Sequence, residues 1–179
     1  TEAAVRKFKI LLSFANPERG RTLLRIASVL LRNQAEKSSV TALHLTPADE
    51  LFRYNVDDYE RESFLPVFEE SQKLTLPITT LFKVSADIES DIVEVAQKGE
   101  FNLLLVGVGQ SIYEGTLLGK VLGFTARMIN PAAIFRKPKR EGIPSRHSVF
   151  DERIRTIVSK CQIPVGILID KNKPGVNRI

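Results

Sequence analysis

Five short apolar runs of strand length recur along this chain, and amphipathic segments with helical spacing separate them. The fourth run, FNLLLV, is almost unbroken, which is typical of a strand buried on both faces of a sheet. Strands that alternate with helices are joined by right-handed crossovers. The sequence therefore predicts a single doubly wound α/β domain with a five-stranded parallel sheet. The five runs cover residues 8–14, 40–45, 77–84, 101–106 and 163–169.

The segments between the apolar runs carry helix signals. Asn16 is the expected N-cap of the first helix, directly before a proline that suits the first helical position. Ser85 is the expected N-cap of the helix that precedes the fourth strand. Gly99 is expected to end that helix as a left-handed cap residue. Apolar spacing places the other helices over about 17–34, 57–74 and 150–161.

The stretch between the fourth and fifth strands is unusually long. Residues 114–129 repeat apolar side chains three and four positions apart, which predicts a helix. Gly115, Gly119 and Gly123 each oppose that helix by about 1 kcal/mol relative to alanine. Glycines four positions apart also allow another backbone to approach closely. This stretch is therefore expected to enlarge the domain rather than to form an ordinary crossover.

Composition excludes several classes of protein. A chain of 179 residues is long enough for one domain with a sizeable core, and no window approaches the ~20 apolar residues of a membrane span. The single cysteine, Cys161, excludes a disulfide framework, and His44 and His147 lie far apart, so no metal site is expected. Because the chain begins at Thr1 without a methionine or a signal peptide, we expect a fragment of a longer protein.

Charge is distributed unevenly along the chain. Acidic side chains dominate residues 48–70, and basic side chains dominate 131–147. Both runs are typical of solvated surfaces, while the basic one also suits contact with phosphate or an anionic membrane. Nucleic acid is not an expected partner, because the basic run is broken by prolines and lacks interleaved aromatic residues. Its prolines and Gly142 predict a poorly ordered loop over 136–147.

The chain contains no recognisable catalytic motif. There is no Gly-x-Ser-x-Gly elbow and no His-Glu-x-x-His pair. Lys120 follows a glycine as in a phosphate-binding loop, but Val121 stands where magnesium binding requires a hydroxyl. His44 lies inside an apolar strand and is expected to be a structural histidine. We therefore expect a protein that is not an enzyme, with no catalytic residues.

In a doubly wound sheet, ligands bind at the carboxyl ends of the strands where the strand order switches direction. Here these ends are the turn at Ala15 and Asn16 and the stretch Gly107-Val108-Gly109-Gln110-Ser111. Glycines after a buried strand permit a sharp turn that presents N–H groups to an anion. The same glycines also suit a plain tight exit from the strand, and the sequence leaves both interpretations open.

The order of these elements resembles the universal stress protein family. The resemblance rests on FKILLSF with its Asn-capped helix, on SADIESDIVEVAQKGEFNLLLVGVG, and on a helix that runs into QIPVGILID. The resemblance implies the adenine nucleotide alpha hydrolase-like fold with strand order 3-2-1-4-5. It also implies a domain over 8–170 with an enlarged 108–147 segment, preceded by a linker over 1–7 and followed by a tail over 171–179.

The opening segment FKILLSFANPERGRTLLRIASVLL resembles more closely the domain of this type that ends many bacterial monovalent cation:proton antiporters. This resemblance implies a regulatory or interaction domain on the cytoplasmic face of the bacterial inner membrane. The expected partner is then the transmembrane part of the same antiporter. The alternative is a stand-alone universal stress protein that binds an adenine nucleotide.

Departures from the family pattern fall on the nucleotide site. Ala15 stands where nucleotide-binding members carry an aspartate that contacts adenine, and Gln110 stands where the second glycine of the phosphate loop belongs. The resemblance thus implies a degenerate site, weak or absent ATP binding and no required cofactor. The residues that would contact a ligand are Ala15, Asn16, Gly107, Gly109 and Ser111.

The last strand is expected to lie at the edge of the sheet. Its residues Ile163, Val165, Ile167 and Ile169 alternate on one face. An exposed apolar edge strand invites pairing with another chain. Members of the family usually pair through this strand, so a homodimer is expected. The competing expectation is that the enlarged 108–147 segment folds over this edge and keeps the domain monomeric.

Overall fold

The computed structural model describes residues 7–51, 55–108 and 146–169, and these form one α/β domain. The strands are β1 Phe8–Phe14, β2 Ser38–Pro47, β3 Ile78–Ser85, β4 Leu103–Val108 and β5 Val165–Ile169. The helices are α1 Pro17–Leu30, α2 Ala48–Leu51, α3 Val56–Leu74, α4 Ile88–Lys98 and α6 Arg146–Lys160, with a 3₁₀ turn at Ala35–Lys37.

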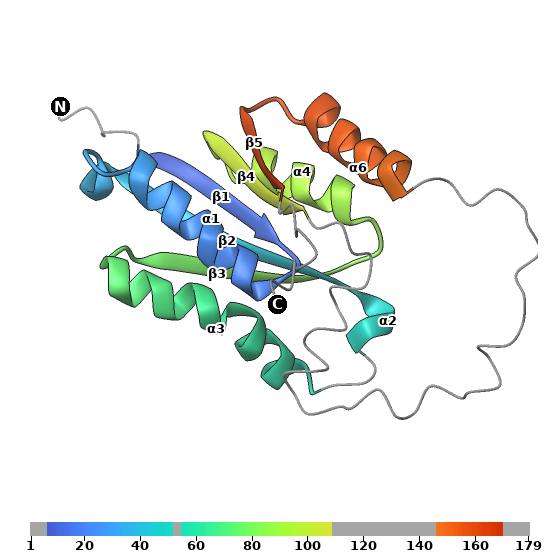
Figure 1. The fold of residues 1–179 in the computed structure, drawn as a ribbon, viewed down its shortest axis with the longest axis horizontal. Helices are drawn as coiled ribbons and strands as arrows, with labels where there is room; N and C mark the ends of the chain where they lie inside the picture. Colours follow the sequence, from blue (N-terminus) through green and yellow to red (C-terminus); the bar gives the residue numbers. More distant parts are fainter. Residues whose placement is uncertain (1–6, 52–54, 109–145, 170–179) are drawn as a thin grey trace, which may run out of the picture.

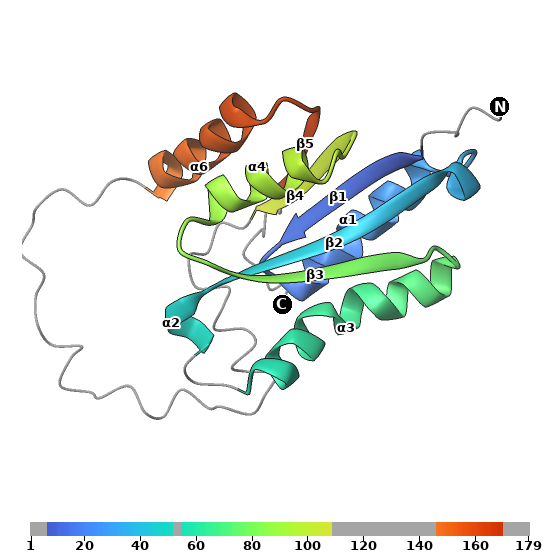
Figure 2. The same ribbon diagram turned by 180° about the vertical axis from the view of Figure 1, so that it is seen from behind.

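The five strands form a parallel sheet in the order β3-β2-β1-β4-β5, which confirms the predicted fold class and strand order. In Figure 1, α1 and α3 lie on the near side of the sheet, and Figure 2 shows α4 and α6 on the opposite side. Two apolar clusters form the core, one on each face of the sheet. β5 lies at the sheet edge, as predicted.

Helix α1 begins where the sequence predicts and ends earlier. The Asn16 side chain accepts a hydrogen bond from the backbone N–H of Glu18 at 2.9 Å, which confirms the N-cap. The helix ends at Leu30 rather than near residue 34. Its buried stripe ends at Leu31, and the chain then turns through the 3₁₀ segment into β2. No apolar contact remains beyond that point to hold a further helical turn.

The predicted N-cap of α4 is wrong, and Gly99 is its C-cap, as predicted, but without the predicted left-handed conformation. Asp87, and not Ser85, caps the helix, since its carboxylate accepts from the backbone N–H of Ser90 at 3.1 Å. Ser85 is the last residue of β3, and its hydroxyl donates to Asp91. Gly99 has a right-handed φ of −77°, and the left-handed residue is Glu100, with φ of 53°.

A different constraint explains the glycine at position 99. A Cβ atom there would lie 2.2 Å from Cε2 of Phe101, whose ring is buried against the α4 side of the sheet. The position thus requires glycine because of a steric contact with the nearby ring of Phe101 and not because of its backbone angle.

The long helix α3 confirms the looser pattern seen in the sequence. Tyr59, Phe64 and Val67 are buried, and the helix continues through Pro66. Helix α6 begins at Arg146, four residues before the predicted start. Among the described residues, no helix is long and apolar enough to span a membrane. The loop predicted over 136–147 lies, up to residue 145, outside the described part of the chain.

Candidate functional site

The parallel register brings the ends of β1 and β4 together at the carboxyl edge of the sheet. Ser13 of β1 pairs with Val106 of β4, so the turn at Ala15 and Asn16 lies beside Gly107. The Ala15 methyl is exposed, and Asn16 is half-buried with its side-chain oxygen used by the α1 cap. Ala15 and Asn16 thus lie at the same edge of the sheet as Gly107, and none of these three residues has a carboxylate side chain.

Gly107 differs from its predicted setting. It is an internal residue of β4, paired with Leu168 of β5, and not part of a turn after the strand. Both interpretations left open by the sequence place Gly107 after the strand, and this placement is wrong, because β4 continues to Val108. Gly109 and Ser111 lie outside the described residues.

The side chain of Arg19 lies over Gly107, and the sequence did not identify this arginine as a site residue. A Cβ atom at position 107 would lie 3.3 Å from Cβ of Arg19 and 3.5 Å from its Cδ. Arg19 is 7% exposed although it carries a full positive charge. The signal that could have identified it is its place in the apolar stripe of α1, four residues before Leu23. The site thus contains a buried guanidinium at the carboxyl edge.

His44 lies behind this site, in the interior. It is 1% exposed, and its Nδ1 donates a hydrogen bond to the carbonyl oxygen of Phe14 at 3.1 Å. A carbonyl oxygen only accepts, so Nδ1 carries the proton of the neutral ring. Nε2 is buried without a hydrogen-bond partner among the described residues.

Aromatic rings enclose the His44 imidazole. It stacks on Phe82 with an interplanar angle of 12°, while Phe14, Tyr59 and Phe64 lie with ring centroids 5.8 to 6.2 Å away. Burial lowers the pKa of His44 to about 4, and the hydrogen bond to Phe14 opposes that shift. No charged side chain contributes to the shift. A base for catalysis would need a nucleophile or a substrate within reach, so the geometry supports the predicted structural role.

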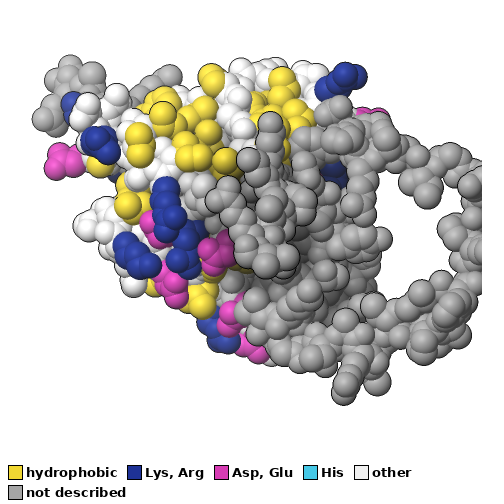
Figure 3. Space-filling view, in the orientation of Figure 1, with side chains coloured by type: hydrophobic (Ala, Val, Ile, Leu, Met, Phe, Trp, Pro, Cys, Tyr) yellow, Lys and Arg dark blue, Asp and Glu magenta, His cyan; other side chains and the backbone are white. Residues whose placement is uncertain are grey.

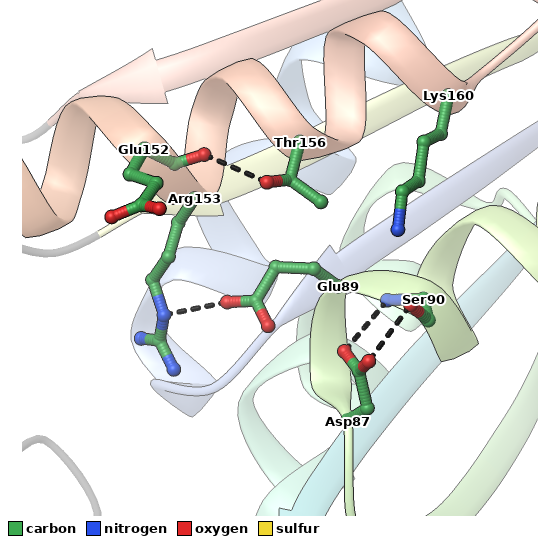
Figure 4. Close-up of a pocket in the computed structure, with 7 residues that line it drawn as sticks. All are labelled: Asp87, Glu89, Ser90, Glu152, Arg153, Thr156 and Lys160. Atoms are coloured by element: carbon green, nitrogen blue, oxygen red, sulfur yellow. Dashed lines mark hydrogen bonds and ion pairs between the residues drawn. The ribbon is translucent and has the colours of Figure 1, made fainter.

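A polar cleft of about 300 Å³ lies elsewhere, between α4 and α6. In Figure 4 an ion pair between Arg153 and Glu89 closes one side at 2.5 Å, and Lys160 extends toward the start of α4. Asp87 has a lowered pKa because it accepts two hydrogen bonds from Ser90. The charges in the cleft largely compensate one another, so it has the character of a solvated helix–helix junction.

Metal-binding geometry is not found in the described residues, where no group of three or more His, Cys, Asp or Glu side chains converges. Cys161 is partly buried against the core cluster of the α4 side. The arrangement at the carboxyl edge consists of the buried side chain of Arg19, a capped helix N-terminus and a strand glycine that Arg19 and Leu23 cover. The described residues of this arrangement offer no nucleophile–base pair.

No protein-family model matches this chain, and no curated protein matches it by sequence. Solved structures do match by fold. The universal stress protein from Archaeoglobus fulgidus in complex with dAMP aligns with a TM-score of 0.55 over 90% of this chain and 98% of that chain, at 14% identity. A second structure of the universal stress protein from Archaeoglobus fulgidus gives a TM-score of 0.55 over 89% and 92%, at 16% identity. At such identities the likeness establishes the fold alone: this chain has the universal stress protein fold.

Proposed function

We propose that this chain is a non-catalytic regulatory domain of a bacterial cation:proton antiporter, acting through protein contacts or ligand sensing at the cytoplasmic face of the membrane. The proposal that the domain is non-catalytic rests on one observation at the carboxyl edge of the sheet. The fold retains the edge at which such sheets bind ligands, but Ala15 presents an exposed methyl there and Asn16 is occupied by the helix cap. The antiporter part rests on the resemblance of the opening segment through Asn16-Pro17-Glu18.

The parent reading frame tests the antiporter part directly. We expect about a dozen apolar spans encoded upstream of Thr1, each near 20 residues long. A start codon directly before the first strand, with no upstream spans, would reject the antiporter. Transport by the whole protein tests regulation. Removing residues 8–170 is expected to change the pH or cation dependence of exchange in membrane vesicles while leaving exchange itself intact.

A second candidate function is adenine nucleotide binding. The specific observation in its favour is the buried guanidinium of Arg19 beside Gly107, since arginine suits phosphate groups. One protein of the same fold is described in complex with dAMP. Against it stands Ala15, which replaces the aspartate implied by the family resemblance.

Thermal unfolding with nucleotide separates the two candidates. A ligand at 100 times its dissociation constant adds about 2.7 kcal/mol to the free energy of unfolding. We expect no change in melting temperature with millimolar ATP and Mg²⁺. A rise of several degrees that disappears in Arg19→Ala, but persists in the exposed control Arg32→Ala, would favour nucleotide binding instead.

A further inference from the structure

The strand β3 lies at the edge of the sheet opposite β5, and it carries apolar side chains on both faces. Among the strands that the structure describes, it pairs only with β2. Ile78 and Phe82 pack against the core cluster on the α1 side. Leu81 points to the other face, since it is in register with Leu43 of the cluster on the α4 side. Apolar residues on both faces are typical of a strand inside a sheet and not of an edge.

Exposed hydrophobic side chains are concentrated around this edge. Of the ten large hydrophobic side chains that are exposed in the described residues, five lie on α3 and β3, namely Val56, Leu65, Phe68, Leu81 and Val84. Val84 is 44% exposed and shares a face of β3 with Phe82, whereas Leu81 is 39% exposed on the other face. Figure 2 shows that no described helix covers β3 on the α4 side. Exposed hydrophobic residues that gather in one place mark a site of interaction.

Helix α3 directs a phenylalanine toward the same edge. The opposite side of this helix faces α1, since Glu70 forms an ion pair with Arg25 at 2.7 Å, and Glu69 forms one with Arg21 at 3.0 Å. Figure 3 shows basic and acidic side chains intermingled on this face of the molecule. Phe68 lies two positions before Glu70, about 200° around the helix, and is 51% exposed. Phe68 therefore projects away from α1, on the side of β3.

The single charged residue of β3 is turned away from the edge. A lysine on an edge strand normally keeps other strands from pairing with it. The ammonium of Lys83, however, lies 2.9 Å from Oδ1 of Asp91 and 3.4 Å from Oε2 of Glu94, and both carboxylates belong to α4. These ion pairs hold the side chain over the sheet and compensate its charge. The backbone of β3 therefore remains accessible to another strand.

We propose that β3 pairs with β3 of a second copy of this chain, antiparallel and about a two-fold axis at Leu81. The strand spans Ile78–Ser85, so an axis at this residue passes near its middle and pairs almost its whole length. A two-fold contact is closed, because the same edge is used on both copies. It would place the exposed side chains on both faces of β3 beside those of the partner.

The sequence of β3 complements itself in this register. In an antiparallel pair, opposite residues share a face of the sheet. On the α3 side, Ile78 lies opposite Val84 of the partner subunit. On the α4 side, Leu81 lies opposite Leu81 of the partner subunit, and Thr79 lies opposite Lys83 of the partner subunit. Apolar residues thus meet apolar residues, and no two like charges face each other.

The same axis brings ends of α3 that carry opposite charges toward each other. Asp57 and Asp58 lie in the first turn of α3, and Lys73 lies in its last. In Figure 1 the end of α3 lies beside the start of β3, so antiparallel strands bring the first turn of one α3 toward the last turn of the other. This charge complementarity favours a second copy in the antiparallel direction. Stable complexes bury about 1,200–2,000 Å², and two short strands offer less, so we expect pairing only at several hundred micromolar.

Disulfide cross-linking of the full chain tests the proposal, after Cys161→Ser removes its single cysteine. An axis at Leu81 places the two copies of this residue about 4.5–5.5 Å apart between Cα atoms, which suits a disulfide. At several hundred micromolar, we expect Leu81→Cys to form disulfide dimers at least tenfold faster than Thr79→Cys. Thr79 is the matched control, because it is exposed on the same face, while its two copies lie about 13 Å apart along the strands.

Phe68→Glu in the Leu81→Cys chain is expected to slow cross-linking at least tenfold. Leu30→Glu changes a leucine of α1 that is 54% exposed and is expected to leave the rate unchanged. Circular dichroism reports whether each variant is folded.

Sedimentation equilibrium of Ile169→Arg measures pairing at β3 apart from β5, and it decides the result if the cysteine variants do not fold. We expect monomers at tens of micromolar and dimers at about one millimolar. The proposal is rejected if Leu81→Cys cross-links no faster than Thr79→Cys. It is also rejected if Ile169→Arg stays monomeric at about one millimolar, which would leave the β3 edge to a strand of another protein.

Discussion

The imidazole of His44 donates a hydrogen bond from Nδ1 to the carbonyl oxygen of Phe14, across two neighbouring strands that also place these residues in register. Phe14 is the last residue of β1, directly before the turn at Ala15. The hydrogen bond therefore fixes the tautomer of the neutral His44 ring. It also holds the backbone of Phe14, directly before the turn that begins the candidate site. The remaining surroundings of His44 are aromatic, which makes its protonated form costly.

Acid is expected to destabilise the domain through His44. Its pKa is lowered to about 4 in the folded chain from an ordinary value of 6.5, so the unfolded chain binds the proton more tightly. Neutral His44 therefore contributes about 3 kcal/mol to the free energy of unfolding above pH 6.5. This contribution is lost as the pH falls toward 4. Urea unfolding from pH 7 to pH 4.5 measures most of this loss.

The chain has one other histidine, which supplies the control. His44→Phe is expected to flatten stability between pH 6.5 and 4.5, while His147→Gln keeps the slope. Glu70 and Asp91 have pKa values lowered by Arg25 and Lys83, so their contribution is lost at lower pH. An unchanged slope in His44→Phe would contradict the assignment to His44.

Substitution of Gly20 by alanine is expected to destabilise the domain although alanine favours a helix by about 1 kcal/mol. A Cβ atom there would lie 2.5 Å from Cγ2 of Val67 and 2.7 Å from Cζ of Phe14, both buried. The overpacked contact between α1, α3 and β1 should cost 1–3 kcal/mol, roughly, in free energy of unfolding. Thr22→Ala on the exposed side of α1 is the control, and a stabilised Gly20→Ala would show that α1 packs differently.

The β5 edge is expected to mediate a homodimer. β5 pairs only with β4 in the described sheet, and Ile169 is 44% exposed on it. Sedimentation equilibrium at tens of micromolar should give a dimer that Ile169→Arg dissociates. Val158→Arg alters a similarly exposed residue of α6, 50% exposed, and should leave the dimer intact. A wild-type monomer at these concentrations rejects the pairing.

The basic run is expected to bind anionic lipid. Lys137, Lys139 and Arg140 lie in it, and attraction of this kind is screened within about 10 Å at 0.1 M salt. Co-sedimentation should show binding to anionic vesicles that salt weakens and that glutamate at all three positions abolishes. Replacing Arg32 and Lys37 by glutamate removes exposed charges elsewhere and is the control. Equal binding to neutral vesicles would refute the expectation.

Much of the architecture follows from local pattern. Apolar periodicity predicts all five strands and the main helices, and Asn16 marks the start of α1, because a cap acts through hydrogen bonds within a few residues. The predicted ends of helices and strands are less accurate where pairing with a strand distant in sequence extends an element. Gly107 is such a case, since pairing with β5 keeps it inside β4.

The sequence by itself determined the alternation of strands and helices, and the resemblance it carries supplied the strand order. Only the tertiary structure decided that Arg19 covers Gly107 and that Phe14 and Val67 crowd Gly20. It also decided that His44 bonds to Phe14 across 30 positions of the chain. The physical reason is that periodicity and caps depend on neighbours in sequence. Burial, hydrogen-bond partners and steric limits at a glycine depend on residues that the fold alone brings together.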